Sequence, residues 1–516
     1  MNLWQGLEPS LLIALSIIVP FVGALLVIVT GKNPNLREAV TLTTATILFT
    51  IVLAITDHTF NGTELSLNVI ELFPGLGINF EVEPLGVLFA LVASFLWIVT
   101  TIYAIGYMRG HNEVNQTRFF CCFALAISSV MAICFSGNLL TLFIFYEVLT
   151  LSTYPLVTHA GTEAAKQGGR TYLGILLGTS IAFLLFAVMG TYSLTGTLDF
   201  KAGGIFDESH SKAILSVLLV LFCYGVGKAA LMPFHRWLPA AMVAPTPVSA
   251  LLHAVAVVKA GVFSILKIVI YIFGIDTLKE LATTDIMLYI GAATVLLSSC
   301  IAMTKDNLKA RLAYSTISQL SYIVVGALLA SSIASAGAAL HIATHAVGKI
   351  TLFFCAGAIM VASHKKNISD MVGLGRQMPL TMAAFTIGAI SIIGLPPMAG
   401  TWSKWYLTIG ALEADKLIIV AVLMISSLLN IAYLLPIPVK AFFNTQPESG
   451  SGAGETKPWS WSETKEAPLP MLIALGITSF GCLALFFYPQ PLVDLINLIP
   501  GVSTSLEMHS IINGAG

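Results

Sequence analysis

Long apolar stretches, separated by short polar segments, follow one another along almost the whole chain. An α-helix needs about 20 mostly apolar residues to cross the hydrocarbon core of a bilayer. By that measure the pattern predicts fourteen membrane-spanning helices, near residues 11–30, 39–56, 84–106, 119–135, 138–157, 172–194, 213–232, 246–274, 284–303, 312–330, 336–362, 380–410, 417–439 and 469–489. The polar insert at 444–467 is rich in Gly, Ser, Glu and Lys, which predicts a solvated loop. The sequence therefore predicts an all-α polytopic membrane protein.

Prolines interrupt this apolar pattern at two places. Four of them follow Lys228 at the end of the seventh span, and the run GLPPMAG breaks the twelfth span before Lys404. Interrupted spans at matching places in two halves point to a transport site built from inverted repeats. The layout predicts four units: N-terminal helices 1–3 in residues 1–118, a first repeat in 119–274, a second repeat in 284–443, and a polar loop, a last helix and a tail in 444–516.

The composition supports a membrane protein throughout. Of all residues, 57% are hydrophobic and 10% are charged, whereas a soluble domain has about 25% charged residues. All seven cysteines fall in apolar runs without a C-x-x-C or Cys/His cluster, so we expect no disulfide, metal site or haem. Nucleic acid is not an expected partner. The first ten residues contain no Lys or Arg, so the run from Leu11 lacks the start of a signal peptide and is expected to be a retained helix.

The loop charges predict an orientation. Alternate loops hold sixteen Lys and Arg residues, whereas the other loops hold only Lys201, Lys212, Lys279 and Lys416. Loops rich in Lys and Arg stay on the inner side. We therefore expect both termini on the outer side, together with the acidic loop between spans two and three.

Five lysines remain inside the predicted spans, at positions 228, 259, 267, 349 and 404. Glu147 is the one acidic residue that the pattern places well inside a span, so one carboxylate would face five ammonium groups. Some of these lysines must be neutral, hydrated or paired with groups from outside the chain. Ionisable groups inside a membrane usually face an interior path and take part in function.

Glu147 and Lys228 are the first candidates for a proton path. Thr150 and Tyr154 follow Glu147 at i+3 and i+7, which places the three side chains on one helical face. The alternative is a carboxylate that only pairs with a lysine and locks two helices together. Lys228 precedes Pro233 by five residues, where a loosened helix would admit water. The alternative for Lys228 is a side chain that extends to the interface, and for Lys267 that is the favoured interpretation.

Histidines and lysines recur in the eighth and eleventh spans. His253 and Lys259 share the eighth span but lie on different faces, and His253 could equally be a satisfied core residue. In the eleventh span His341, His345 and Lys349 follow one another at i+4 on one face. Such a stripe has the composition of a proton relay. A metal site would need a third ligand, which this helix does not offer.

Lys404 follows the double proline of the twelfth span, with Thr401 and Thr408 on its helical face. Its place after the interruption matches that of Lys228 near the first proline-rich break. We therefore expect Lys404 to act at the second interrupted span.

Several of these runs resemble the antiporter-like subunits of respiratory complex I and of Mrp-type multisubunit cation/proton antiporters. They are GKAALMPFHRWLPAAMVAPTPVSALLHAVAVVKAG, the stretch around Glu147, HIATHAVGK and GLPPMAGTWSKW. The resemblance extends from about the third to the thirteenth span. It implies fourteen helices, two inverted five-helix repeats with discontinuous helices 7 and 12, and proton transfer along a hydrated axis at mid-membrane depth.

By position, the resemblance implies roles for individual residues. Glu147 and Lys228 match the family's ion-paired glutamate and lysine, and Lys404 matches the terminal lysine of the second half-channel. The central relay is matched by Lys259, His341, His345 and Lys349, and His253 is a supporting candidate. The chain length, the lysine at position 404, and the phrases FYEVLTLSTYPLVTH and KEAPLPM are most similar to the Mrp D subunit.

The expected function is that of a proton-translocating subunit of a Mrp-type sodium/proton antiporter in the bacterial plasma membrane. Its partners would be other membrane subunits and the lipid bilayer, with Na⁺ bound largely by the partners because Glu147 is the one deep carboxylate. We expect no cofactor and a transporter subunit rather than an enzyme. The alternatives are a proton-pumping membrane subunit of a complex I or hydrogenase-type oxidoreductase, and a structural scaffold whose lysines only pair with partner helices.

Overall fold

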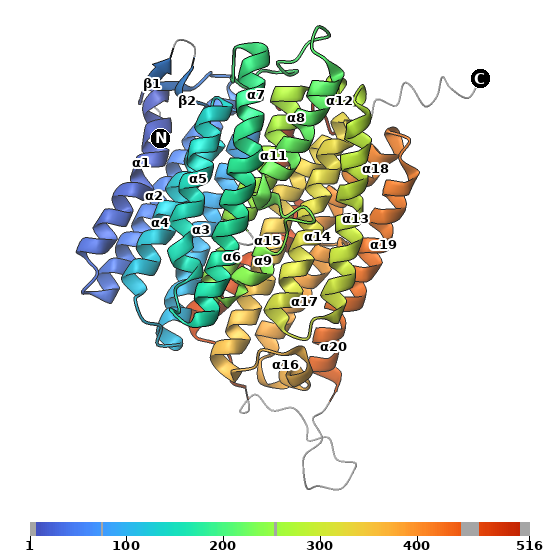
Figure 1. Cartoon of the computed structure of the whole chain (residues 1–516). Helices are drawn as coiled ribbons and strands as arrows, with labels where there is room; N and C mark the ends of the chain where they lie inside the picture. The colour runs from blue at the N-terminus through green and yellow to red at the C-terminus, as the bar shows by residue number, and fades with distance from the viewer. Residues whose placement is uncertain (1–6, 74–75, 252–254, 445–463, 506–516) are drawn as a thin grey trace.

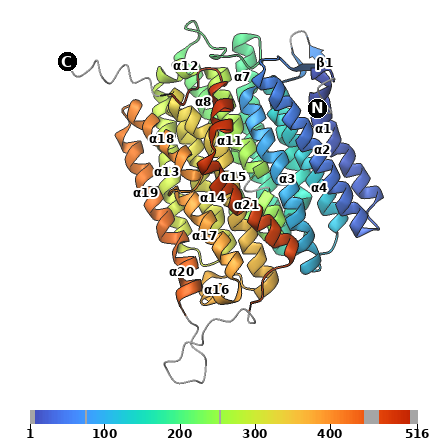
Figure 2. The same ribbon diagram turned by 180° about the vertical axis from the view of Figure 1, so that it is seen from behind.

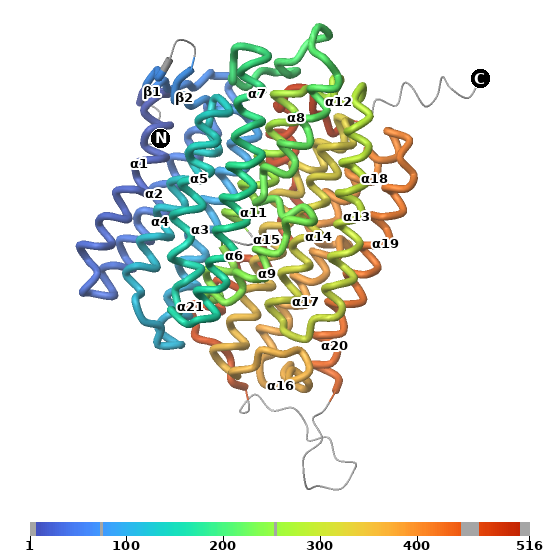
Figure 3. The backbone as a smooth tube through the Cα atoms, in the orientation of Figure 1, coloured from blue at the N-terminus to red at the C-terminus, as the bar shows by residue number. Residues whose placement is uncertain are grey.

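The structure, a computed structural model of the whole chain, describes residues 7–73, 76–251, 255–444 and 464–505. Its helices run side by side in one bundle (Figure 1), and the tube in Figure 3 shows α1 and α2 at one edge and α19 at the opposite edge. An all-α polytopic membrane protein is confirmed, with the exception of one small hairpin. Among the described residues, ten helical segments are long and apolar enough to cross a membrane.

The N-terminal part contains three long helices and this hairpin. The helices are α1 (Pro9–Val29), α2 (Pro34–Phe60) and α3 (Pro84–Gly110), and the strands are β1 (Ser66–Phe73) and β2 (Leu76–Glu81). Each of the three helices has proline in its first turn, where no backbone N–H is needed. The strands pair antiparallel, with Ser66 opposite Glu81. The sequence interpretation had treated this segment as an acidic loop, and it missed two short β-prone runs on either side of a Pro-Gly pair.

The middle part contains the first interrupted span. Its helices are α4 (Gln116–Cys134), α5 (Leu139–Val157), α6 (Glu163–Thr179), α7 (Leu185–Thr195), α8 (Lys212–Gly225), α9 (Trp237–Ala240), α10 (Thr246–Leu251), α11 (Val257–Ile268) and α12 (Ile275–Lys279). A π-helical turn joins α6 to α7. Helix α8 ends at Gly225, and Lys228 follows in a single 3₁₀ turn. The helix therefore ends just before Lys228.

The last part contains the second interruption. Its helices are α13 (Ala282–Thr304), α14 (Leu308–Leu328), α15 (Ser332–Ser363), α16 (Leu374–Gln377), α17 (Pro379–Ile393), α18 (Gly400–Glu413), α19 (Leu417–Leu434), α20 (Pro436–Phe443), α21 (Leu469–Phe487) and α22 (Gln490–Asn497). Between α17 and α18, Gly394 has φ +88, and a Cβ on Gly400 would lie 1.9 Å from the Ser391 oxygen. Glycine is therefore required where the twelfth span breaks.

Helix α15 is the longest helix, and it packs against α14, α17, α18, α21 and α3. Figure 2 shows α21 crossing the back of the bundle at an angle, and α21 contacts both α3 and α15. Every apolar stretch predicted to span the membrane holds a helix or a helix pair. Fourteen crossings and the inverted-repeat relation of the two halves stay predictions.

The two ends of the bundle differ in their elements. We call the end with β1, β2 and α12 the hairpin end, and the end with α16 and α20 the α16 end (Figure 1). Acidic residues of the hairpin segment, including Glu64, Glu71 and Glu81, belong to the first end, and Arg376 and Lys440 belong to the second. Which of the two ends faces outward stays a prediction.

Candidate functional site

Lys228 is fully buried at the break after α8. Its ammonium donates to the Tyr146 carbonyl oxygen at 2.8 Å and to Thr150 Oγ1 at 2.5 Å, and it lies 3.1 Å from the centre of the Tyr146 ring. The Tyr146 hydroxyl also accepts the Lys228 backbone N–H at 3.0 Å. Tyr146 of α5 thus contacts both the backbone N–H and the ammonium of Lys228.

Glu147 lies next to this contact on α5. It interacts electrostatically with Lys228, and Ser180 in the π-helical turn is another polar neighbour. Ser180 is thus the hydrogen-bonding neighbour of the Glu147 carboxylate, and among the described residues no ion pair within 4.0 Å joins Glu147 to Lys228. The predicted face of α5 does reach Lys228, but through Thr150.

Lys259 of α11 contacts the histidine stripe of α15. Lys259 Nζ lies 2.6 Å from His345 Nδ1, and the His345 and His341 rings stack with centres 5.5 Å apart. His341 Nδ1 lies 2.8 Å from Ser403 Oγ of α18. All of these side chains are buried. Lys259 is therefore joined to the neighbouring helix α15 through His345.

Lys349 shares the predicted face of α15 but has different partners. Its ammonium donates to Ser315 Oγ of α14 at 2.7 Å, and the Tyr433 hydroxyl oxygen of α19 lies 2.9 Å from the same Ser315 oxygen. The Tyr433 hydroxyl in turn donates to the Asn430 side-chain oxygen. Lys349 therefore begins a polar branch toward α19.

Lys404 lies at the break of the twelfth span. Its ammonium donates to the Ile393 carbonyl oxygen at 2.9 Å and to Ser427 Oγ of α19 at 3.2 Å. Ile393 is the last residue of α17, so the cation occupies the negative end of that half-helix. The Tyr322 ring, 4.9 Å from the ammonium, stacks on His341 with centres 5.7 Å apart.

These contacts join side chains of α11, α15, α18 and the 3₁₀ turn after α8 into one buried line. We call it the lysine axis and define it by Lys228, Lys259, His345, His341, Lys349 and Lys404. Direct contacts run from Lys259 through both histidines and the Tyr322 ring to Lys404. Lys228 is linked to Lys259 by packing, since a Cβ on Gly261 of α11 would lie 2.4 Å from the Lys228 carbonyl carbon.

Several buried atoms along this axis have no protein partner among the described residues. They include Nε2 of both histidines and the amide of Gln319 on α14, which is fully buried. Buried polar groups of this kind are commonly satisfied by ordered water. The geometry therefore suits a relay that combines side chains and water.

Sequence reasoning missed the partners of the axis. They are Tyr146, Ser315, Tyr322, Ser403, Ser427 and Tyr433, all polar or aromatic residues within apolar spans. The one visible signal in the sequence was the polar run STISQLSY, which lies in α14. His253, which the sequence also proposed, lies outside the described residues.

The expectation for Lys267 was wrong. Its side chain is fully buried and does not extend to the interface. Lys267 Nζ lies 3.0 Å from Glu83 Oε2 and donates to the Ser136 carbonyl oxygen at 2.6 Å. Glu83, placed in the acidic outer loop by the sequence, is therefore a buried carboxylate that pairs with one of the five lysines, and the imbalance of five lysines to one carboxylate is smaller than inferred.

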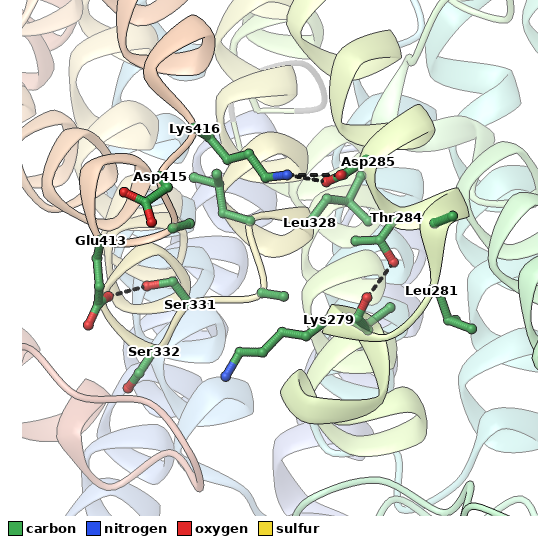
Figure 4. A pocket seen from close by; sticks show the side chains of 15 residues that line it. Lys279, Leu281, Thr284, Asp285, Leu328, Ser331, Ser332, Glu413, Asp415 and Lys416 are labelled. Atoms are coloured by element: carbon green, nitrogen blue, oxygen red, sulfur yellow. Dashed lines mark hydrogen bonds and ion pairs between the residues drawn. The ribbon is translucent and has the colours of Figure 1, made fainter.

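A pocket of about 480 Å³ opens at the hairpin end between the α12–α13, α14–α15 and α18–α19 turns (Figure 4). Three of its charged residues are engaged, because Lys416 pairs with Asp285 at 2.8 Å and Ser331 donates to Glu413 at 2.6 Å. Leu407 of α18 is fully buried against α15 between this pocket and Lys404. We therefore do not count the pocket as part of the lysine axis.

Comparisons with known proteins agree with this architecture. The family described as NADH:quinone oxidoreductase/Mrp antiporter, transmembrane, matches residues 136–430. NADH-quinone oxidoreductase subunit N of Desulforudis audaxviator is 32% identical over 431 residues, which cover 82% of this chain and 84% of that protein. The chloroplast NAD(P)H-quinone oxidoreductase subunit 5 of Chara vulgaris is 31% identical over 82% of this chain, but the chain spans only 64% of that protein.

Solved structures share the fold. A chain of the Mrp complex from Dietzia sp. DQ12-45-1b superposes with a TM-score of 0.83 at 22% identity, covering 98% of this chain and 100% of that one. A chain of an archaeal membrane-bound sulfane sulfur reductase superposes with a TM-score of 0.81. These neighbours are subunits of multisubunit membrane complexes. The match over residues 136–430 and the similarity to subunit N show that this chain belongs to the NADH:quinone oxidoreductase/Mrp antiporter transmembrane family.

Proposed function

We propose that this chain is a proton-translocating subunit of a Mrp-type multisubunit sodium/proton antiporter in the bacterial plasma membrane, with both termini on the outer side. The observation that supports this most is the buried run of direct contacts from Lys259 through His345, His341 and Tyr322 to Lys404. Buried amines and imidazoles can gain and lose protons, which a relay requires.

Each part of the axis has a distinct task in this proposal. Glu147 modulates the charge of Lys228 from a neighbouring position, while Tyr146 and Thr150 hold the ammonium. Lys259 exchanges a proton with His345, and Lys404 exchanges a proton at the break of the twelfth span between α17 and α18. His253 is a supporting member of the relay, and Lys349 is joined to it through Ser315.

Sodium is proposed to be bound mainly by partner subunits. Na⁺ prefers several oxygen ligands, and the carboxylates inside the described bundle have other surroundings. Glu38 pairs with Arg109, Glu83 pairs with Lys267, and Glu147 lies beside Lys228. None of the three offers an anionic cage, so we propose that partner subunits provide one.

The experiment replaces Lys404 by arginine in the assembled complex. Arginine keeps the positive charge but cannot readily give up its proton, so we expect Na⁺-driven proton exchange in inverted membrane vesicles to fall at least tenfold. Lys416→Arg is the matched control, because Lys416 follows the same helix but forms a surface ion pair with Asp285. Unchanged exchange in Lys404→Arg would support a scaffold and contradict the relay.

A proton-pumping subunit of a complex I-type oxidoreductase is the second candidate. It is favoured by the 32% identity to NADH-quinone oxidoreductase subunit N, of which this chain covers 84%. The phrases FYEVLTLSTYPLVTH and KEAPLPM favour the Mrp D-like assignment, whereas lysine at position 404 also occurs in one complex I subunit and fits both candidates. Affinity purification from the native membrane separates the two, because complex I-type partners include soluble cluster-bearing subunits and Mrp partners are all membrane proteins.

A further inference from the structure

The Glu83–Lys267 ion pair is a buried titratable site outside the lysine axis. The Lys267 side chain is 0% exposed and the Glu83 side chain is 9% exposed. Phe200 covers the ammonium, with its ring centre 4.3 Å from Nζ. A buried ion pair costs desolvation free energy and is weak evidence for a purely stabilising role. Its place in the bundle therefore needs another explanation.

This pair is close to solvent at the hairpin end. Glu83 immediately precedes α3, and the neighbouring Glu81 on β2 is exposed and interacts electrostatically with Lys267. The other titratable groups around the pair are Cys134 at the end of α4 and Tyr271 in the π-helical turn after α11, and the buried Tyr271 hydroxyl has no partner in the described chain. A proton on Glu83 therefore has a short way to solvent through Glu81.

Toward the membrane interior, the same pair is aligned with Lys259. Lys259, Phe263 and Lys267 follow one another at i, i+4 and i+8, so they occupy one face of α11. The two lysines are about 12 Å apart along the helix. Phe263 lies between them, and its ring centre is 5.8 Å from Lys267 Nζ.

A second phenylalanine packs against Phe263. Its ring packs against Phe89 of α3, with centres 5.3 Å apart, and both side chains are fully buried. Along α3, Phe89 lies farther from the hairpin end than Glu83 does. Along α11, Phe263 likewise lies farther from that end than Lys267 does. The two phenylalanines therefore form an apolar layer beneath the ion pair.

We propose that Glu83 and Lys267 form a proton-exchange site at the hairpin end, and that the Phe89–Phe263 contact is the barrier that separates this site from Lys259. When the rings part, water lets the Lys259 ammonium pass one proton to the Glu83 carboxylate. Lys259 becomes a neutral amine and Glu83 a neutral acid, which then releases the proton to solvent beside Glu81. The proposal rests on the proposed role of Lys259 as a proton carrier.

The test measures passive proton entry into liposomes that contain the assembled complex. A potassium diffusion potential drives protons in, an internal pH dye reports them, and Na⁺ is left out. We expect Phe263→Ala to speed proton entry at least fivefold over wild type. We expect the double variant Phe263→Ala/Glu83→Gln to return close to the wild-type rate, because glutamine cannot accept the proton.

The matched control is Phe273→Ala. Phe273 is also a fully buried phenylalanine, at the end of the π-helical turn that follows α11, but it packs against Phe206 and Phe222, away from this line. If Phe263→Ala leaks no faster than Phe273→Ala, the barrier assignment is wrong. If the double variant leaks as fast as Phe263→Ala, the Glu83 site is wrong, because a merely structural ion pair would make the leak worse when weakened. Phe263→Leu provides the same comparison should the alanine variant fail to assemble.

This readout is independent of antiport. Passive entry without Na⁺ requires neither a sodium site nor a particular set of partners. A failure of Lys404→Arg to change antiport would therefore contradict the proposed function. The proton leak of Phe263→Ala would still test the Phe89–Phe263 barrier and the Glu83 site.

Discussion

The packing of α15 against α18 makes a quantitative prediction about Gly410. A Cβ at this position would lie 2.6 Å from both the Cβ and the backbone nitrogen of Ala334. Carbon atoms pack best at about 3.5–4.0 Å, so alanine at position 410 would push the two helices apart by roughly 1 Å. Overpacking of this kind costs about 1–3 kcal/mol, offset by about 0.5–1 kcal/mol from the better helix propensity of alanine.

The shift would also reach the lysine axis. Helix α18 contains Ser403, whose hydroxyl lies 2.8 Å from His341 Nδ1, and Lys404 follows it. A displacement of about 1 Å takes that contact beyond the usual hydrogen-bond distance. Gly410→Ala is therefore expected to lower both the stability of the protein and the rate of proton exchange.

The assay compares thermal unfolding of purified Gly410→Ala with that of Gly476→Ala in the same detergent. Gly476 in α21 has no atom within 4 Å of its would-be Cβ, so alanine there should be neutral or slightly stabilising. If the two variants unfold at the same temperature, the close approach of α15 and α18 does not limit stability and the reasoning fails. Exchange measured in vesicles then reports whether the axis is disturbed as well.

Three further outcomes follow from other contacts. Glu466→Ala removes the carboxylate that accepts the Leu380 N–H at 2.6 Å at the start of α17, and thermal unfolding should show a loss of about 0.5–2 kcal/mol. Lys259→Met removes the 2.6 Å partner of His345 Nδ1, and vesicle exchange should fall at least tenfold while the complex still assembles. Hydrogen bonds from Ser369 hold the pKa of Asp306 below its usual value, so its stabilising effect is present above pH 4 and is lost as the pH falls through its folded-state pKa. Because Asp306 is exposed, wild type and Asp306→Asn should differ by less than about 1 kcal/mol at pH 7 and converge as the pH falls through the lowered folded-state pKa.

The spans and their interruptions could be read from the sequence because they depend on local features. Apolar length identifies a span, and Gly394 and Gly400 mark a break that other residues cannot adopt. The positions of Lys228 and Lys404 beside the two breaks were predictable for the same reason. The β1–β2 hairpin was missed because its exposed, short strands resemble a polar loop in composition.

Contacts between distant helices could not be predicted in this way. Lys259 and His345 are 86 positions apart, and nothing in either segment specifies the other. Lys267 shows the same limit, since the choice between interface and interior depends on where Glu83 lies in space. Burial and pairing are properties of the assembled bundle, whereas apolar length belongs to each helix.

The position of α21 has a consequence for how the protein is made. This helix covers α3 near Gly106, where a Cβ would lie 2.7 Å from Met471, and it also covers α15. Among the described residues it follows every other long helix in chain order, and segments of a nascent chain become available from the N-terminus onward, so it leaves the ribosome after them. Until it arrives, those faces of α3 and α15 are open to lipid. The packing of α3 and α15 in the bundle can therefore be completed only after α21 has been translated and inserted.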